Sequence, residues 1–246
     1  FTQLRLTVSC KIFRINIIKN NYLLKLITLP CILLWGLLTF SSLSLAATSH
    51  PTWLNKALEK AEQLNTNNPV LALDFTLSLL KEHNDQLSLS GKAAIFSRLA
   101  EYQSYLGNSK DSLKYINKYY ELTANLATSD GISLLITHGS VLDSLGKPKQ
   151  AMDLYLQAEK HAKAIENKQL LGESYAAMGS SYSESLNDSE ALKYFHKAYL
   201  LFKESGNELE LAYLKVQMSH SYSYIYDDEK AVSLAIEAIE YFQQHE

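Results

Sequence analysis

Histidine side chains are the first candidates in this chain for metal binding or acid–base catalysis. Those beyond the N-terminal segment include His83, His138, His161, His196 and His220. None belongs to a Glu-flanked pair on one helical face, and none has a cysteine partner, so the spacing that a zinc site needs is missing. His138 directly precedes a small residue, Gly139, in a position typical of a buried structural histidine. The sequence therefore predicts no metal site and no cofactor site.

Serine and tyrosine side chains give no catalytic motif either. The sequence contains no Gly-x-Ser-x-Gly motif, no phosphate-binding glycine loop and no paired cysteines. Ser180, Ser181 and Ser219 have no base–acid pair near them in sequence, which favours a role as small packing residues. The aromatic clusters Tyr119-Tyr120 and Ser221–Tyr224 either face a ligand or line the core. We expect no catalytic residue in this chain, and hence no enzyme activity of its own.

Small residues recur about every 40 positions and indicate the elements that must position any site. The first series is Ala72, Ser112, Ala151, Ala191 and Ala231, and the second, twelve residues upstream of its last four members, is Ala100, Gly139, Gly179 and Ser219. A third series is Ala158, Ala198 and Ala238. Repeats of this length predict stacked helical hairpins instead of one globular core.

Residues 172–207 illustrate one repeat. Apolar and small residues follow a 3.6-residue period, break at 186–190, and resume over a longer stretch. Asp188 and Ser189 are candidate N-caps for the second helix, and Gly206 suits its C-terminal cap. Gly179 and Ala191 are expected to let the two backbones approach closely. In the preceding repeat, Pro148 falls where it can open a helix.

The repeats resemble tetratricopeptide repeats. The resemblance rests on Leu99-Ala100, Gly139 and Gly179 with Tyr182, followed by Ser112, Ala151 or Ala191 and then by Ile116, Tyr155 or Phe195. It covers residues 92–246 as four repeats, preceded by a degenerate first unit over 52–90. It implies an all-α fold, a right-handed α-solenoid of helix-turn-helix repeats. The period near 40 exceeds the usual length of about 34 residues, so the second helices should be longer.

The resemblance also implies a concave binding surface lined by the first helix of each hairpin. On this sequence the lining residues are Glu101, Tyr105, Ser140, Asp143, Glu173, Ser180, Glu184, His220 and Tyr224. This surface is acidic and aromatic, and it lacks the Lys and Asn clamp with which chaperone-binding members hold a C-terminal carboxylate. The implied partner is a protein or an extended peptide, basic in charge. The alternative is that these carboxylates form only a solvated face.

The charge is unevenly distributed along the chain. Residues 1–46 contain five basic residues and no acidic one, so the remainder holds 18 basic and 26 acidic residues. Nucleic-acid binding requires clustered lysine and arginine, so we expect no nucleic-acid partner.

Residues 1–47 are predicted to be a signal peptide or a membrane anchor. Lys19 and Lys25 precede an apolar stretch, and small residues allow cleavage near Ala46/Ala47. No methionine precedes Met152, so the first 18 or so residues are interpreted as upstream read-through or as part of a longer leader. Both cysteines, Cys10 and Cys31, lie in this segment, and the mature part would form no disulfide.

A signal sequence followed by long repeats is similar to the N-terminal regions of bacterial diguanylate cyclases (GGDEF proteins) and of some sensor histidine kinases. We therefore expect a periplasmic or exported interaction region, with any catalytic domain C-terminal to this chain. The last repeat ends in an amphipathic helix without a capping helix, which suggests truncation; a longer protein would then be membrane-tethered through the N-terminal segment or a missing C-terminal span. The alternative is a stand-alone periplasmic scaffold or envelope-assembly adaptor.

Overall fold

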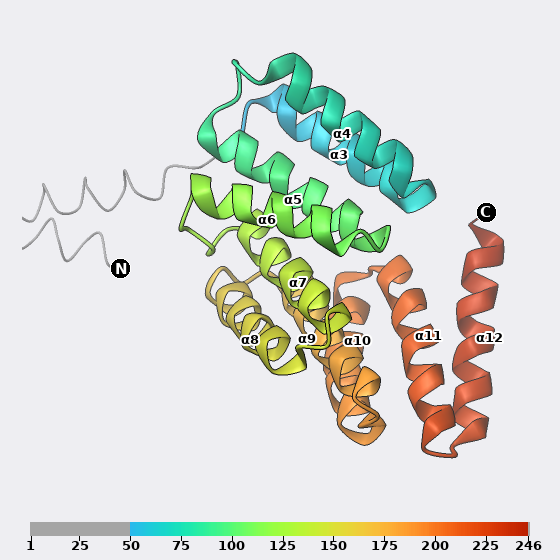
Figure 1. Ribbon diagram of the computed structural model, residues 1–246. Coiled ribbons are helices and arrows are strands. Elements are labelled where there is room, and N and C mark those ends of the chain that lie inside the picture. Colours follow the sequence, from blue (N-terminus) through green and yellow to red (C-terminus); the bar gives the residue numbers. More distant parts are fainter. Residues whose placement is uncertain (1–49, 246) are drawn as a thin grey trace, which may run out of the picture. The chain divides into compact units, whose positions relative to one another are not determined.

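The computed structural model describes residues 50–245. The signal peptide or anchor expected over residues 1–47, its cleavage point and both cysteines lie outside this range. Ten α-helices and no strand occur within it, and each helix packs against the next one along the chain (Figure 1). None of these ten helices is long and apolar enough to span a membrane.

The helices form five antiparallel hairpins, as the predicted α-solenoid requires. The hairpins are α3 (Thr52–Asn67) with α4 (Pro69–His83), α5 (Leu89–Tyr105) with α6 (Ser109–Leu122), α7 (Ser129–Ser144) with α8 (Pro148–Ala164), α9 (Lys168–Glu184) with α10 (Asp188–Ser205), and α11 (Glu208–Tyr224) with α12 (Asp228–Gln244). First helices of successive hairpins also pack together, as α5 does on α7 and α7 on α9. The expected unit boundary near residue 90 falls inside α5, because that helix already begins at Leu89.

Side-chain caps fix where most first helices begin. The side chains of Ser88, Thr128, Asn167 and Asn207 accept the backbone N–H groups of Gly91, Gly131, Leu170 and Glu210 at 3.0–3.2 Å. These caps repeat with the same 39–40-residue period as the small residues, and each satisfies an N–H that a helix start leaves without a partner.

The two N-cap candidates predicted for α10, Asp188 and Ser189, are wrong. The helix begins at Asp188, with Asn187 in the N-cap position and no side-chain cap bond. Asp188 is buried and instead accepts a hydrogen bond from Ser183 Oγ at 2.7 Å. This carboxylate connects the two helices of the hairpin and does not cap the start of the second one. Pro148 at the start of α8 and Gly206 at the end of α10, with φ of 69°, agree with the sequence prediction.

In four of the five hairpins, a small residue of one helix lies in direct contact with the other helix. A Cβ on Gly139 would lie 2.3 Å from the Tyr155 ring, and one on Gly179 would lie 2.5 Å from the Phe195 ring. Two other hairpins have a hydroxyl at this crossing instead: Ser112 Oγ donates to the Ala100 carbonyl and Ser219 Oγ to the Ala231 carbonyl, both at 2.7 Å. The crossing is therefore closed either by a ring against glycine or by a hydrogen bond.

The core runs along the stack of hairpins. Its largest fully buried side chains include Tyr102, Tyr119, Tyr155, Phe195 and Phe202. Tyr119 and Tyr222 are buried and belong to hydrophobic clusters. Most aromatic residues of the sequence clusters Tyr119-Tyr120 and Ser221–Tyr224 therefore contribute to packing.

In four of the five hairpins the turn between the two helices contains one residue in the left-handed region, whereas Asn68 between α3 and α4 is extended. Gly107 and Gly146 supply it in two hairpins with φ of 73° and 71°, and open space surrounds both. The next two hairpins hold Leu186 and Tyr226 at this position, each 40 residues after the preceding one, with φ of 59° and 63°. A side chain with a Cβ is strained in this conformation by about 1–2 kcal/mol. Leu186 gains little in return, because it is 79% exposed.

Replacing Leu186 with Gly should raise the free energy of unfolding by about 0.5–1 kcal/mol, because relief of backbone strain exceeds the extra unfolded-state entropy of glycine. The matched reverse change, Gly146→Leu, should lower it by a similar amount, since nothing lies near that glycine except its own backbone. Urea denaturation followed by circular dichroism measures both. Equal effects of the same sign would show that the turn conformation does not govern stability here.

Candidate functional site

A hollow of about 800 Å³ lies along the first helices of the hairpins. Its wall comes mainly from α3, α5, α7, α9 and α11, which is the face that the sequence prediction assigned to binding. Seven predicted residues line it: Glu101, Tyr105, Ser140, Asp143, Glu173, Ser180 and Glu184. The structure thus brings together residues from three successive hairpins.

Two predicted residues, His220 and Tyr224, do not line this hollow. They are exposed on α11, and their rings contact each other at a centroid distance of 4.7 Å. Glu184, the residue 40 positions before Tyr224, does line the hollow. It lies on α9, which packs against both α7 and α11, whereas among residues 50–245 no further first helix follows α11. The lining of the hollow on α11 is therefore limited to residues from the first part of that helix, up to Gln217.

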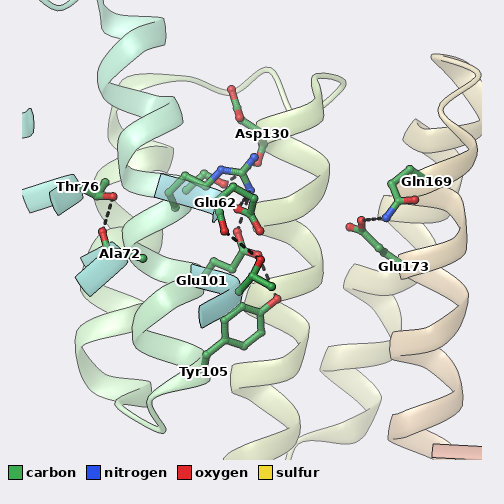
Figure 2. Close-up of polar contacts among 11 residues, drawn as sticks. Glu62, Ala72, Thr76, Glu101, Tyr105, Asp130, Gln169 and Glu173 are labelled. Atoms are coloured by element: carbon green, nitrogen blue, oxygen red, sulfur yellow. Dashed lines mark hydrogen bonds and ion pairs between the residues drawn. The ribbon is translucent and has the colours of Figure 1, made fainter. Parts of the chain in front are cut away.

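A charged network occupies the α5 wall. Arg98 Nη1 lies 3.0 Å from Glu101 Oε2 and 3.7 Å from Glu62 Oε2 on α3. Tyr105 Oη donates to the other oxygen, Glu101 Oε1, at 3.1 Å, and Figure 2 shows this group of side chains together. Burial opposes the Arg98 charge, but Glu101 and Glu62 more than compensate and raise its pKa. Arg98 is therefore a fixed cation already paired with protein carboxylates.

The opposite wall carries Glu173 on α9. Gln169 Nε2 donates to Glu173 Oε1 at 2.8 Å, and Asn207 Nδ2 donates to Gln169 Oε1 at 3.0 Å (Figure 2 shows the first bond). Desolvation raises the pKa of Glu173 to about 8; Glu210 and Glu101 add to this, while the Gln169 bond opposes it. Burial, followed by Glu62 and Glu101, also raises the pKa of Glu210.

Asp143 joins three helices at another part of the hollow. Its Oδ2 accepts the Tyr155 hydroxyl of α8 at 2.8 Å, and its Oδ1 accepts the Ser181 hydroxyl of α9 at 3.0 Å. Burial raises the Asp143 pKa, although both hydrogen bonds favour the charged form. Both oxygens of this side chain are committed to holding neighbouring helices together.

The hollow has a strong excess of acceptors. Its lining contains six carboxylates, Glu62, Glu101, Asp143, Glu173, Glu184 and Glu210, and a single basic residue, Arg98. Within residues 50–245 no group of three or more His, Cys, Asp or Glu side chains could hold a metal ion. Chemically, the surface is suited to accepting hydrogen bonds from a cationic ligand that brings its own donors.

Four residues of the hollow were not predicted from the sequence: Glu62, Arg98, Gln169 and Glu210. Arg98 carried a usable signal, because it stands three residues before Glu101 and such pairs meet on a helix surface. Gln169 and Glu210 carried a weaker one: each lies near the start of a first helix, two or three residues after a capping asparagine. No sequence signal identifies Glu62, which approaches Arg98 from another hairpin.

Two of the histidines, His138 and His196, have hydrogen-bonding partners on neighbouring helices. His138 Nδ1 lies 3.2 Å from the Tyr120 hydroxyl, and burial lowers the His138 pKa, in keeping with a structural histidine. His196 is exposed, as expected, yet its Nε2 lies 2.9 Å from the Tyr222 hydroxyl and joins α10 to α11.

Known structures share this architecture at low sequence identity. The Rap protein complexed with Competence and Sporulation Factor matches with a TM-score of 0.68 and 18% identity, over 74% of this chain and 51% of Rap. PlcR from Bacillus thuringiensis, in complex with the peptide PapR7 and DNA, matches with a TM-score of 0.69 and 11% identity, over 82% of this chain and 74% of PlcR.

A putative kinesin light chain from Podospora anserina with nearly identical TPR-like repeats matches with a TM-score of 0.51 and 11% identity, over 81% of this chain and 99% of that one. No protein-family model and no curated relative matches the sequence. The fold is thus a TPR-like helical repeat, and the chain spans about half the length of Rap.

The raised pKa of Glu173 predicts a pH dependence of stability. The folded state retains a proton up to a pKa of about 8, whereas the unfolded side chain releases it near 4.5, so the free energy of unfolding should fall as pH rises through this window. Glu173→Gln should reduce the slope. Urea denaturation at several pH values measures it, with Glu59→Gln, an exposed carboxylate outside the hollow, as the control. An unchanged slope in Glu173→Gln would contradict the assignment.

Proposed function

We propose that this chain is a binding module whose hollow takes up an extended peptide or protein segment carrying positive charge. The observation that carries the proposal is the composition of the hollow: six carboxylates face one arginine, and that arginine is already paired with Glu62 and Glu101. A cationic segment supplies the charge that the wall lacks, and it removes the mutual repulsion of these carboxylates.

The size of the hollow also favours a peptide. At about 800 Å³ it lies in the range of small-molecule and peptide sites, and it extends over several hairpins rather than closing into one pocket. Proteins of similar fold give a precedent, since PlcR was determined with the peptide PapR7 and Rap with Competence and Sporulation Factor. Their low identity to this chain supports the fold alone, so the charge preference rests on the residues of the hollow.

An acetylated and amidated decapeptide that alternates serine with lysine provides a direct test by isothermal titration calorimetry at about pH 9, where Glu173 is ionised and the lysine side chains keep their charge. Reversing two charges with Glu173→Lys and Glu184→Lys should weaken its binding at least about tenfold, because both carboxylates face the hollow.

The matched control reverses Glu59 and Glu240, two exposed acidic residues outside the hollow, and leaves the net charge identical. Equal loss of affinity in both double variants would show only a general charge effect. Unchanged affinity in the Glu173/Glu184 variant would refute the assignment of the site.

We further propose that the module is exported, as the sensory region of a membrane signalling protein; a periplasmic scaffold or envelope-assembly adaptor is the alternative. Support comes from the basic and apolar residues of positions 19–40 and the small residues before Ala47. Residues 1–60 fused to a phosphatase that is active only after export should give activity in a bacterial host. A mature N-terminus at Ala47 would identify a signal peptide, whereas retention of the N-terminal segment would identify a membrane anchor. An inactive fusion would exclude export.

A further inference from the structure

Three consecutive hydrogen bonds connect the start of helix α11 to Glu173 in the hollow. The backbone N–H of Glu210 donates to Asn207 Oδ1 at 3.2 Å, and Asn207 Nδ2 donates to Gln169 Oε1 at 3.0 Å. Gln169 Nε2 then donates to Glu173 Oε1 at 2.8 Å. Asn207 and Gln169 are 38 residues apart, so this relay crosses from one hairpin to the next.

The direction of the relay is fixed at its first bond. A backbone N–H can only donate, so the oxygen of the Asn207 amide must face Glu210 and its NH₂ group must face Gln169. The same argument then orients the Gln169 amide, whose NH₂ group must face Glu173. Glu173 Oε1 is therefore always an acceptor from Gln169, and Oε2 is the oxygen left for a proton or a ligand.

Two other carboxylates of the hollow, Glu101 and Asp143, have no such free oxygen. Glu101 Oε2 contacts Arg98 and its Oε1 accepts from Tyr105. Asp143 uses both oxygens for Tyr155 and Ser181. The side chain of Glu210 forms no hydrogen bond within residues 50–245, and it lies close enough to Glu173 to raise its pKa. The acceptors left for a ligand at this part of the hollow are one oxygen of Glu173 and the carboxylate of Glu210.

We propose that Gln169, held by Asn207, is a specificity-determining residue that makes the hollow prefer a primary ammonium group, such as a lysine side chain, over a guanidinium group. This inference rests on the proposed function and assigns the class of cation to the same site. A guanidinium binds best when two parallel N–H groups meet both oxygens of one carboxylate, and Gln169 removes that option at Glu173.

An ammonium group has a different geometry. It is a compact charge with three donors, and it can contact single oxygens from separate carboxylates. Glu173 on α9 and Glu210 on the neighbouring α11 provide such oxygens from two walls of one hollow. Glu210 by itself accepts either cation, so the discrimination depends on Glu173 and hence on Gln169.

The first measurement is an NMR titration of the Glu173 carboxyl in the ligand-free protein. Gln169→Leu should raise the Glu173 pKa by about one unit, since a hydrogen bond to the charged form is lost. Asn207→Ser should shift it in the same direction, because serine still caps α11 but does not reach Gln169. Asn167→Ser is the matched control: it makes the same change at the cap of α9, outside the relay, and should leave the pKa unchanged.

The second measurement compares two acetylated and amidated decapeptides, one alternating serine with lysine and the other serine with arginine. The unaltered chain should bind the lysine peptide about fivefold more tightly, and Gln169→Leu and Asn207→Ser should bring the two affinities close together. Asn167→Ser should retain the preference. Circular dichroism confirms that each variant is folded, and the conservative Asn207→Ser provides the comparison if Gln169→Leu is not.

The possible results separate the two proposals. An unmoved Glu173 pKa in both relay variants overturns the role of Gln169, whatever the peptides do. If the Glu173 pKa shifts in the relay variants but neither peptide binds the unaltered chain, the proposed function is refuted and the role of the relay is retained. Equal or tighter binding of the arginine peptide by the unaltered chain overturns the ammonium preference. A lysine preference that disappears with Gln169→Leu supports the inference.

Discussion

The close crossing of two helices within each hairpin is the constraint on which this structure depends. At Gly139 and Gly179 there is no room for a Cβ, because the ring of Tyr155 or Phe195 occupies that volume. These rings are almost fully buried, so the same contact that brings two backbones together also fills the core. Since the crossing recurs every 39 or 40 residues, the first helices are brought to one face and the hollow forms along them.

The hollow adds an opposing electrostatic effect. Packing first helices side by side brings Glu173 and Glu210 near each other and near Glu101, and burial makes the ionisation of Glu173 and Glu210 unfavourable. The protein offsets part of this effect with polar donors: Arg98 and Tyr105 on one wall and Gln169 on the other. In the proposed binding mode, the same carboxylates govern stability and ligand recognition, and occupation by a cation acts on both.

The sequence was sufficient to predict the parts of the fold that are encoded locally. The helical hairpins, the close crossing at Gly139 and Gly179, the left-handed Gly206 and the helix start at Pro148 all depend on residue type and short-range spacing. Seven of the nine predicted residues lie in the hollow for the same reason, because a repeat period places equivalent positions on one face. His220 and Tyr224 follow the period, but among residues 50–245 no further first helix follows α11 to pack beside them.

Interactions between hairpins were beyond sequence reasoning, because they depend on how far one side chain reaches. Gln169 meets Asn207 across 38 residues, and a shift of a few ångströms would separate them. Asn207 has two structural roles: it caps α11, and it orients the Gln169 amide, which faces the hollow. A substitution at Asn207 therefore has to preserve two interactions at once, the cap of α11 and the orientation of Gln169. In the proposed site, the ligand preference can therefore be altered at neighbours outside this relay, such as Glu184 or Ser180, without disturbing the start of α11.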